Sequence, residues 1–285
     1  MFPSDLLSRA ILREAASRAL GEDRGPADLT SLATVPEDRE AEAVIFCKEN
    51  AILAGMPVAE QVFSEEDVRI RFTALAEDGA NLVPGARVLR VSGPGRGLLT
   101  AERTALNFLQ HLSGIATETR RYVNAVEGTG ARILDTRKTV PGLRHLAKYA
   151  VKCGGGTNHR MGLYDQFLIK DNHLLLMGGT GGLKEAVSRA RALNPDLKVE
   201  VEADTLEQVR EIAALGVDIV LLDNMTNEQL REAVALVAGR ALTEASGNMT
   251  LERVRSVAET GVDFISVGAL THSVRAVDFS LEIVS

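Results

Sequence analysis

Short apolar segments alternate with helical patterns through the second half of this 285-residue chain. Polar residues end these segments at regular intervals: Glu202 and Asp223 are 21 residues apart, and Ser246 follows 23 residues later. Gly268 comes another 22 residues on. Strands that are apolar on both faces and return with such a period are typical of the βα units of a parallel barrel. The pattern predicts an α/β barrel. A doubly wound open sheet is the alternative, although no GxGxxG motif opens the first unit.

The expected elements of this region follow from period and length. Its strand candidates are Arg132–Asp135, Phe167–Ile169, Lys198–Val201, Ile219–Leu222, Leu242–Ala245 and Phe264–Val267. Its helical stretches include Gly182–Leu193, Leu206–Leu215, Asn227–Val237 and Leu251–Thr260.

The first part of the chain has a different pattern, which is typical of an α+β region of roughly 100 residues. Ser4 is expected to cap a helix that runs to about Leu20, with Gly21 after it. Turns with glycine and proline separate the strand candidates Ala41–Lys48, Val68–Leu75 and Arg87–Val91. A helical pattern then runs from Leu99 to Glu127, with a break expected near Ser113-Gly114.

Composition excludes several classes of protein. Hydrophobic residues make up 45% and charged residues 25%, which argues against a disordered or fibrous chain. No stretch approaches the roughly 20 apolar residues of a membrane span, and the charged N-terminus does not resemble a signal peptide. Cys47 and Cys153 are too few for a disulfide scaffold or a zinc motif, so we expect a reducing cytoplasm. A net charge of −7 argues against general nucleic-acid binding.

The charges are unevenly distributed. Residues 132–172 contain eight lysines or arginines and three acids, so this segment carries +5 and the rest of the chain −12. A basic segment in an acidic protein indicates a local site for a small anion. Three of its cations, Arg144, Lys148 and Lys152, are four residues apart and are expected to belong largely to a solvated helix face.

The ends of the strand candidates face the catalytic end of a barrel, and most of them carry polar residues. The residues there are Asp135-Thr136-Arg137-Lys138, Lys170-Asp171-Asn172-His173, Glu202, Asp223-Asn224, Ser246-Gly247-Asn248 and Val267-Gly268-Ala269. The cationic group, which includes His159 and Arg160, suits a ligand with carboxylates or phosphates. Glu202 and Asp223 suit Mg²⁺ held through water, or sugar hydroxyls, unless they only pair with lysines in a structural ion network. Glycines after the last two strands let backbone N–H groups approach a phosphate.

At these residues the sequence resembles the quinolinate phosphoribosyltransferases, also called carboxylating nicotinate-nucleotide pyrophosphorylases. The segments that carry the resemblance are AERTALN at 101–107, LDTRKTVPGLR at 134–144, CGGGTNHR at 153–160, LIKDNH at 168–173, VEVE at 199–202, LDNM at 222–225, EASGN at 244–248 and VGALTHS at 267–273. Val140 stands where the family usually has a second threonine, and Pro26-Ala27 replaces a more usual glycine-containing turn. Neither is a charged site position, so only local loop geometry is put in doubt.

The resemblance implies a fold and a reaction. The fold would be an open α/β barrel of about seven strands at residues 111–274 and an N-terminal α/β sandwich domain at residues 1–110, which a C-terminal strand at 275–285 rejoins. The reaction would transfer a phosphoribosyl group from phosphoribosyl pyrophosphate (PRPP) to quinolinate, with Mg²⁺, and release pyrophosphate and CO₂. The product, nicotinate mononucleotide, is a precursor of NAD. The enzyme would be at least a homodimer in which Arg103 reaches the barrel of the other subunit.

The resemblance also implies roles for individual residues. Quinolinate would contact Arg103, Thr136, Arg137, Lys138, His159, Arg160 and Lys170. PRPP would contact Lys138, Lys170, Glu202, Asp223, Ser246, Gly247, Asn248, Val267, Gly268, Ala269 and His272. The catalytic group would be Lys138, Lys170, Glu202 and Asp223, the last two also holding Mg²⁺.

Three other interpretations stay open at this point. A Schiff-base aldolase would use Lys138 or Lys170, but it would leave the paired acids and the glycine loops without a role. A paralogue of the same fold, such as the molybdenum-operon member of the family, would act on a different base; Arg137, His159 and Arg160 together favour a dicarboxylate. A sensor of PRPP or nicotinate would bind without catalysis, although every charged position of the motif is intact.

Overall fold

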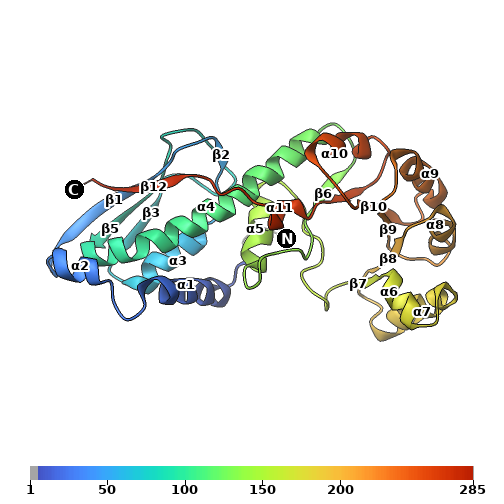
Figure 1. Cartoon of the computed structure of the whole chain (residues 1–285), viewed down its shortest axis with the longest axis horizontal. Helices are drawn as coiled ribbons and strands as arrows, with labels where there is room; N and C mark the ends of the chain where they lie inside the picture. The colour runs from blue at the N-terminus through green and yellow to red at the C-terminus, as the bar shows by residue number, and fades with distance from the viewer. Residues whose placement is uncertain (1–5, 285) are drawn as a thin grey trace. The chain divides into compact units, whose positions relative to one another are not determined.

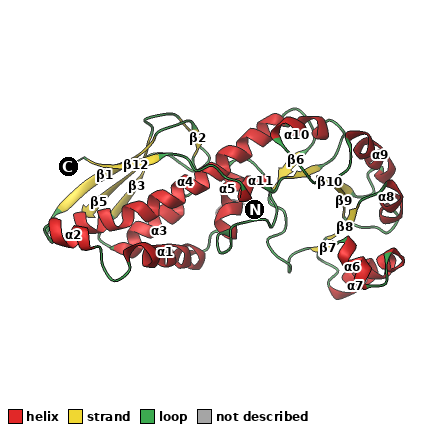
Figure 2. Cartoon of the chain, in the orientation of Figure 1, coloured by secondary structure: helices red, strands yellow, loops and turns green. Residues whose placement is uncertain are grey.

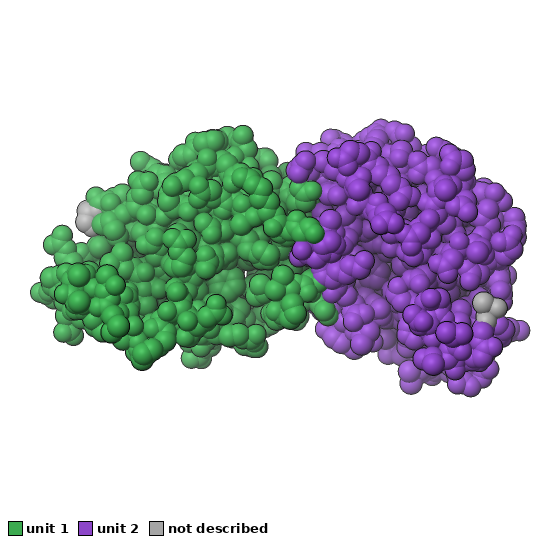
Figure 3. All heavy atoms as spheres, viewed as in Figure 1, with its two compact units in different colours: residues 1–120, 139–155, 273–285 green, residues 121–138, 156–272 purple. Residues whose placement is uncertain are grey.

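The computed structural model describes residues 6–284, which form two compact units. Unit 1 contains the residues up to 120, residues 139–155 and those from 273 onward (Figure 3). Unit 2 contains residues 121–138 and 156–272. Unit 1 thus extends ten residues past the predicted boundary at 110 and also takes in the segment 139–155. Two hydrogen bonds help to fix that segment: Tyr149 Oη donates to Asp78 (2.5 Å), and Arg120 Nε donates to the Gly154 carbonyl (2.9 Å).

Unit 1 is built on an antiparallel sheet of order β12-β1-β5-β3. Its strands are β1 (Glu40–Cys47), β3 (Arg71–Ala74), β5 (Arg87–Pro94) and β12 (Phe279–Ile283), with a separate pair β2 (Ala51–Ile52) and β4 (Asn81–Leu82). Its helices are α1 (Arg9–Arg24), α2 (Leu29–Thr34), α3 (Met56–Glu66), α4 (Gly95–Ala125, which runs on into unit 2) and α5 (Arg144–Cys153). The C-terminal β12 returns to pair with β1, Phe279 opposite Cys47 (Figure 1).

Two helices of unit 1 differ from the prediction. Helix α1 begins at Arg9, where the Ser8 hydroxyl accepts from the Ile11 N–H, and it continues past Gly21 to Arg24. The predicted cap, Ser4, lies outside the described residues. Helix α4 runs unbroken for 31 residues, so the break expected at Ser113-Gly114 is wrong.

Close packing explains the small residues inside α4. The Ser113 hydroxyl accepts from Ala54 N (3.0 Å) and donates to Ala54 O (3.2 Å). A side chain at Gly114 would place its Cβ 2.4 Å from the Arg275 carbonyl oxygen. These residues therefore let other segments approach the helix and do not end it.

Helix α5 corrects another expectation. Arg144 and Lys152 are partly exposed, but Lys148 is completely buried. The spacing of four residues is therefore not a solvated face throughout, since the middle cation lies in the interior of unit 1.

Unit 2 is a parallel sheet of order β6-β11-β10-β9-β8-β7 with helices outside it (Figure 2). Its strands are β6 (Arg132–Leu134), β7 (Phe167–Ile169), β8 (Val199–Ala203), β9 (Ile219–Asp223), β10 (Leu242–Ser246) and β11 (Phe264–Ser266). Its helices are α6 (Asp171–Leu176), α7 (Leu183–Leu193), α8 (Leu206–Ala213), α9 (Asn227–Val237), α10 (Leu251–Ala258) and α11 (Ala269–His272), with a 3₁₀ turn, η2 (Thr180–Gly182).

The six predicted barrel strands are all present, and the sheet is open between β6 and β7 within the described chain. The family resemblance implied about seven strands. A bridge between Leu134 and Thr157 continues the sheet beyond β6 by a single residue pair, too little to form another strand. Threonine caps place two of the helices that follow the strands. The hydroxyls of Thr205 and Thr226 each accept from the backbone N–H of the glutamine three residues on, and the side chain of that glutamine accepts from the threonine's own backbone N–H. No helix among residues 6–284 has the length and apolar content to cross a bilayer.

Candidate active site

A cavity of about 640 Å³ opens at the carboxyl ends of the parallel strands in unit 2. Strand geometry explains its lining. Side chains alternate between the two faces of a strand. Glu202, Asp223 and Ser246 each lie on the inward face of their own strand, and Asp223 pairs with Ser246 in the ladder. The lining residues are Thr136, Arg137, Lys138, His159, Arg160, Leu168, Lys170, Glu202, Leu221, Asp223, Asn224, Glu244, Ser246, Gly247, Asn248 and Ser266.

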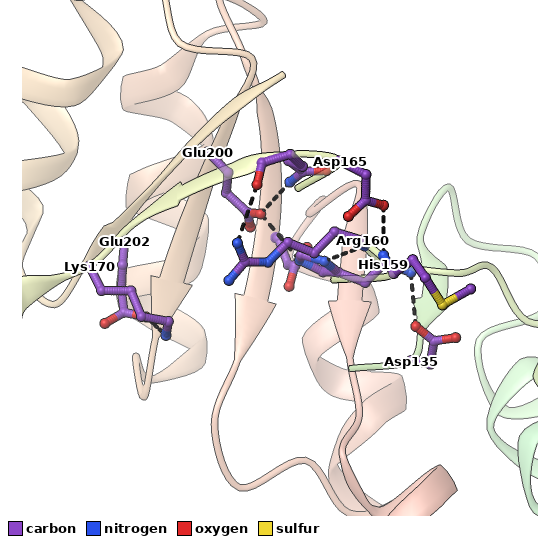
Figure 4. A network of polar contacts seen from close by, with 10 residues as sticks. Asp135, His159, Arg160, Asp165, Lys170, Glu200 and Glu202 are labelled. Atoms are coloured by element: carbon purple, nitrogen blue, oxygen red, sulfur yellow. Dashed lines mark hydrogen bonds and ion pairs between the residues drawn. The ribbon is translucent and has the colours of Figure 1, made fainter. Parts of the chain in front are cut away.

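One wall of the cavity carries an ion pair between the ends of β7 and β8. Lys170 Nζ donates to Glu202 Oε2, with 42% of the lysine side chain exposed and 9% of the glutamate (Figure 4). Burial raises the pKa of the Glu202 carboxyl, and the hydrogen bond from Lys170 partly opposes this. The structural ion network considered from the sequence is thus present for this pair, at the cavity mouth where a ligand can compete for both charges.

Asparagines connect the loops after β9 and β10. Asn224 donates through Nδ2 to Asp223 Oδ2 (2.6 Å) and accepts through Oδ1 from Asn248 Nδ2 (3.2 Å). Gly247 lies against this pair with φ +92°, where a Cβ would sit 2.1 Å from Asn224 Oδ1. A glycine is required here both by the backbone conformation and by the close approach.

Two guanidinium groups make another part of the cavity lining cationic. Arg160 is only 9% exposed and donates through Nη1 to the Gln166 carbonyl (3.2 Å). Burial and the neighbouring charge of Arg137 lower the pKa of Arg160. Holding two such cations close together in a sheltered place is unfavourable in itself, so the arrangement suits an anion with more than one charge.

Beneath the cations lies a cluster that the sequence did not single out. His159 Nε2 is 3.2 Å from Glu200 Oε2 and 3.5 Å from Glu244 Oε2, and both glutamates are buried (Figure 4). His159 Nδ1 accepts the Arg160 N–H (2.7 Å), so both ring nitrogens face protein groups. Asp135, also buried, accepts the His159 N–H (2.9 Å) and Asn158 Nδ2 (2.5 Å).

The remaining predicted residues lie beside the cavity or in the other unit. Val267, Gly268, Ala269 and His272 follow β11 and do not line the cavity. A Cβ on Gly268 would come within 3.0 Å of Lys138 Cδ and 3.2 Å of the His272 ring, so this glycine separates the two side chains. Arg103 is exposed on α4 in unit 1.

The main residues that the sequence analysis missed lie two residues earlier in their strands than the predicted ones. Glu200 and Glu244 precede Glu202 and Ser246 by two residues and therefore share their inward face. Leu168, Leu221 and Ser266 also line the cavity, as does Asn224, which the sequence placed at a strand end without a role. The alternation of side chains between the two faces of each strand was the sequence signal that could have identified Glu200 and Glu244.

Cys153, the one cysteine near a motif, is a buried residue of α5 in unit 1, and burial raises its pKa to about 12. A thiol in that state is a poor nucleophile, which agrees with a packing role.

Together, an open α/β barrel with cations and paired carboxylates at its catalytic end defines an enzyme that joins anionic substrates. The family model described as "Quinolinate phosphoribosyl transferase, C-terminal domain" matches residues 115–282, and that of the N-terminal domain matches residues 28–113.

Individual proteins agree with these matches. Carboxylating nicotinate-nucleotide pyrophosphorylase of Mycobacterium leprae is 46% identical over 279 residues, which cover 95% of this chain and 96% of that protein. The probable enzyme of the same name in Bacillus subtilis is 43% identical, over 92% of this chain and 90% of its own length. The solved structure of nicotinate-nucleotide pyrophosphorylase from Francisella tularensis superposes with a TM-score of 0.92 at 40% identity, covering 98% of each chain. The chain belongs to the quinolinate phosphoribosyltransferase family.

Proposed function

We propose that the cavity in unit 2 transfers the phosphoribosyl group of PRPP to the ring nitrogen of quinolinate. Pyrophosphate and CO₂ leave, and nicotinate mononucleotide, a precursor of NAD, is formed. The observation that carries the proposal is that one cavity has a cationic wall, at Arg137 and Arg160, and an acidic wall, at Glu202 and Asp223, with the charges in each close enough to shift a neighbour's pKa. The first suits a dicarboxylate, and the second suits an activated sugar. Family membership supports the same reaction.

The base would bind at the cationic wall. Quinolinate carries two adjacent carboxylates, and guanidinium groups bind carboxylates through two parallel hydrogen bonds. In this proposal Arg137 and Arg160 take these carboxylates, while Thr136 and Lys138 lie at the same end of β6. Lys170 is paired with Glu202 and would pair with an incoming anion in its place.

The sugar would bind at the acidic wall. Breaking the anomeric C–O bond builds positive charge on the ribose, and the carboxylates of Glu202 and Asp223 stabilise that charge electrostatically. Two carboxylates beside a diphosphate are also the donor set that Mg²⁺ takes in phosphate sites, mostly through water. Glu202 and Asp223 would hold the ion, which neutralises charge on the leaving pyrophosphate when bound.

The 5′-phosphate of PRPP would lie on the loops Ser246–Asn248 and Val267–Ala269, with His272 beside the second loop. After the transfer, the positively charged ring nitrogen stabilises the carbanion left when the 2-carboxylate departs as CO₂. No covalent nucleophile is needed in this scheme. An aldolase, by contrast, requires a desolvated and uncharged lysine, whereas Lys170 is 42% exposed and paired with Glu202.

A homodimer in the cytoplasm completes the proposal, with higher assembly left to solution measurements. Arg103 is exposed on α4, where it would complete the base site of a second copy. Two free, buried cysteines, Cys47 and Cys153, suit a reducing compartment.

The direct test incubates the purified protein with quinolinate, PRPP and MgCl₂ and follows nicotinate mononucleotide and CO₂. We expect product only when all three are present. Nicotinate in place of quinolinate is the control for the choice of base, and equal turnover of the two would refute the assigned dicarboxylate site.

A further inference from the structure

Two buried glutamates, Glu244 in the cavity lining and Glu200 beside it, have no part in the scheme above. Glu200 on β8 and Glu244 on β10 are 0% and 1% exposed. Glu200 Oε2 accepts from Gln166 Nε2 at 2.6 Å and lies 3.2 Å from His159 Nε2. Glu244 Oε2 lies 3.5 Å from the same histidine nitrogen. Placing two acids under a site for a dianion calls for a physical reason.

The histidine tautomer shows what kind of cluster this is. His159 Nδ1 accepts the backbone N–H of Arg160 at 2.7 Å, and Nε2 faces the glutamates. Both ring nitrogens are thus engaged with protein groups. One histidine and two carboxylates also lie close enough together to hold a metal ion. The cluster is a hydrogen-bond network in which His159 is a connector.

This network holds Arg160 at two points. Its backbone N–H donates to His159, and its guanidinium Nη1 donates to the Gln166 carbonyl at 3.2 Å. The side chains of His159 and Gln166 both end on Glu200 Oε2 (Figure 4). Glu200 Oε2 therefore holds both His159 and Gln166, the two residues that bond to Arg160. The direction of a guanidinium decides whether it can meet a carboxylate with two parallel bonds.

We propose that Glu200 is a positioning residue for the pyridine dicarboxylate: through His159 and Gln166 it sets the orientation of Arg160, while Glu244 is the second carboxylate beside His159. This inference rests on the proposed function. It assigns His159 an indirect role in place of direct contact with the base.

The two acids are not equivalent in this arrangement. Glu200 Oε2 accepts from Gln166 Nε2 at 2.6 Å, whereas Glu244 Oε2 makes the longer contact to His159 Nε2, 3.5 Å. Burial and the nearby charge of Glu200 raise the pKa of Glu244 to about 8. The raised pKa of Glu244 lowers the negative charge that the pair places near Arg160. A second charge there would weaken the attraction of Arg160 for a dianion.

Steady-state kinetics of the full-length protein test the proposal with Glu200→Gln, which keeps the size of the side chain but removes its charge. Since hydrogen bonds to a charged acceptor are about twice as strong as neutral ones, we expect the KM for quinolinate to rise about tenfold. The KM for PRPP should stay within about twofold, because the acidic wall is untouched.

Thr243→Val is the matched control. Thr243 is 2% exposed and adjacent to Glu244, but it faces the other side of β10, where its hydroxyl donates to Asp263 (2.9 Å). It should lower the thermal midpoint and leave both KM values unchanged. If Glu200→Gln does not fold, Gln166→Met removes one link to Glu200 and should raise the KM for quinolinate about threefold.

The outcomes are distinct from those for the proposed function. A folded wild-type protein that does not convert quinolinate refutes the function itself. With an active wild type, an unchanged KM for quinolinate in both Glu200→Gln and Gln166→Met overturns the positioning role. An equal rise in the KM for quinolinate and PRPP would do the same, because that is the result of a merely structural role.

Discussion

Replacing Gly247 by alanine should damage PRPP binding in a defined way. Gly247 has φ +92°, and an added Cβ would lie 2.1 Å from Asn224 Oδ1, 2.6 Å from its Cγ and 3.0 Å from its backbone nitrogen. Because the two shortest contacts are with the end of a side chain, the Asn224 amide can move away, while the backbone nitrogen at 3.0 Å stays a tight contact. In doing so it gives up the bond to Asp223 (2.6 Å) and the bond from Asn248 (3.2 Å).

Two terms give the size of the effect. A left-handed conformation costs an alanine about 1–2 kcal/mol, whatever the space around it. Losing two hydrogen bonds adds about 1 kcal/mol each, so Gly247→Ala should destabilise unit 2 by about 3 kcal/mol. Gly239→Ala is the matched control, because Gly239 has φ +72° with nothing within 4 Å of the added Cβ. Gly239→Ala should lower the free energy of unfolding only by the cost of the left-handed backbone conformation, about 1–2 kcal/mol.

Thermal unfolding and PRPP titration separate these terms. At about 3–4 °C per kcal/mol, Gly247→Ala should lower the Tm by about 10 °C and Gly239→Ala by about 5 °C. Only Gly247→Ala should raise the KM for PRPP, by about tenfold, since only there does Asp223 lose the side chain that orients it. If the two variants have the same Tm and the same KM for PRPP, the steric argument for Gly247 is wrong.

Three further predictions concern charge. Arg160→Ala should raise the KM for quinolinate at least tenfold more than that for PRPP, and equal losses in a titration would count against the two-wall division. The pKa of Glu244 is raised from 4.5 to about 8, so the folded protein holds an extra proton between these values and its stability should fall as pH rises through this window. In Glu244→Gln the Tm should lose that part of its pH dependence, and parallel Tm–pH curves for the two proteins would contradict the assignment. Mixing Arg103→Ala with Lys138→Ala subunits should restore activity through hybrid dimers, and verified hybrids without activity would place Arg103 outside the partner's site.

The sequence predicted the barrel and the position of its site because both depend on local periodicity. Strand ends in a parallel sheet meet at one edge, so polar residues after apolar segments come together wherever the strands lie. Helix α9 has the predicted bounds, Asn227–Val237, because the capping threonine Thr226 and the apolar period both mark it.

Other features depend on neighbours that are distant along the chain. Gly114 looks like a helix breaker in isolation, but its purpose is the approach of Arg275, 161 residues further on. Lys148 repeats the spacing of a solvated face, yet its burial depends on how α5 packs in unit 1. Neither partner can be read from a local pattern, because glycine and lysine each occur in both situations.

The segment Val199–Ala203 shows where stricter reasoning from the sequence could have gone further. In a strand buried on both faces, Glu200 and Glu202 must point the same way, and that way is inward if either is catalytic. An interior acid that cannot reach the mouth needs a donor or a proton, and a sequence with two such acids, Glu200 and Glu244, needs a donor between them. His159 fills that place from the basic segment 132–172. His159 lines the cavity, as predicted for a site residue, and the role proposed for it here is to connect Arg160 to these two acids, which the Glu200→Gln variant will test.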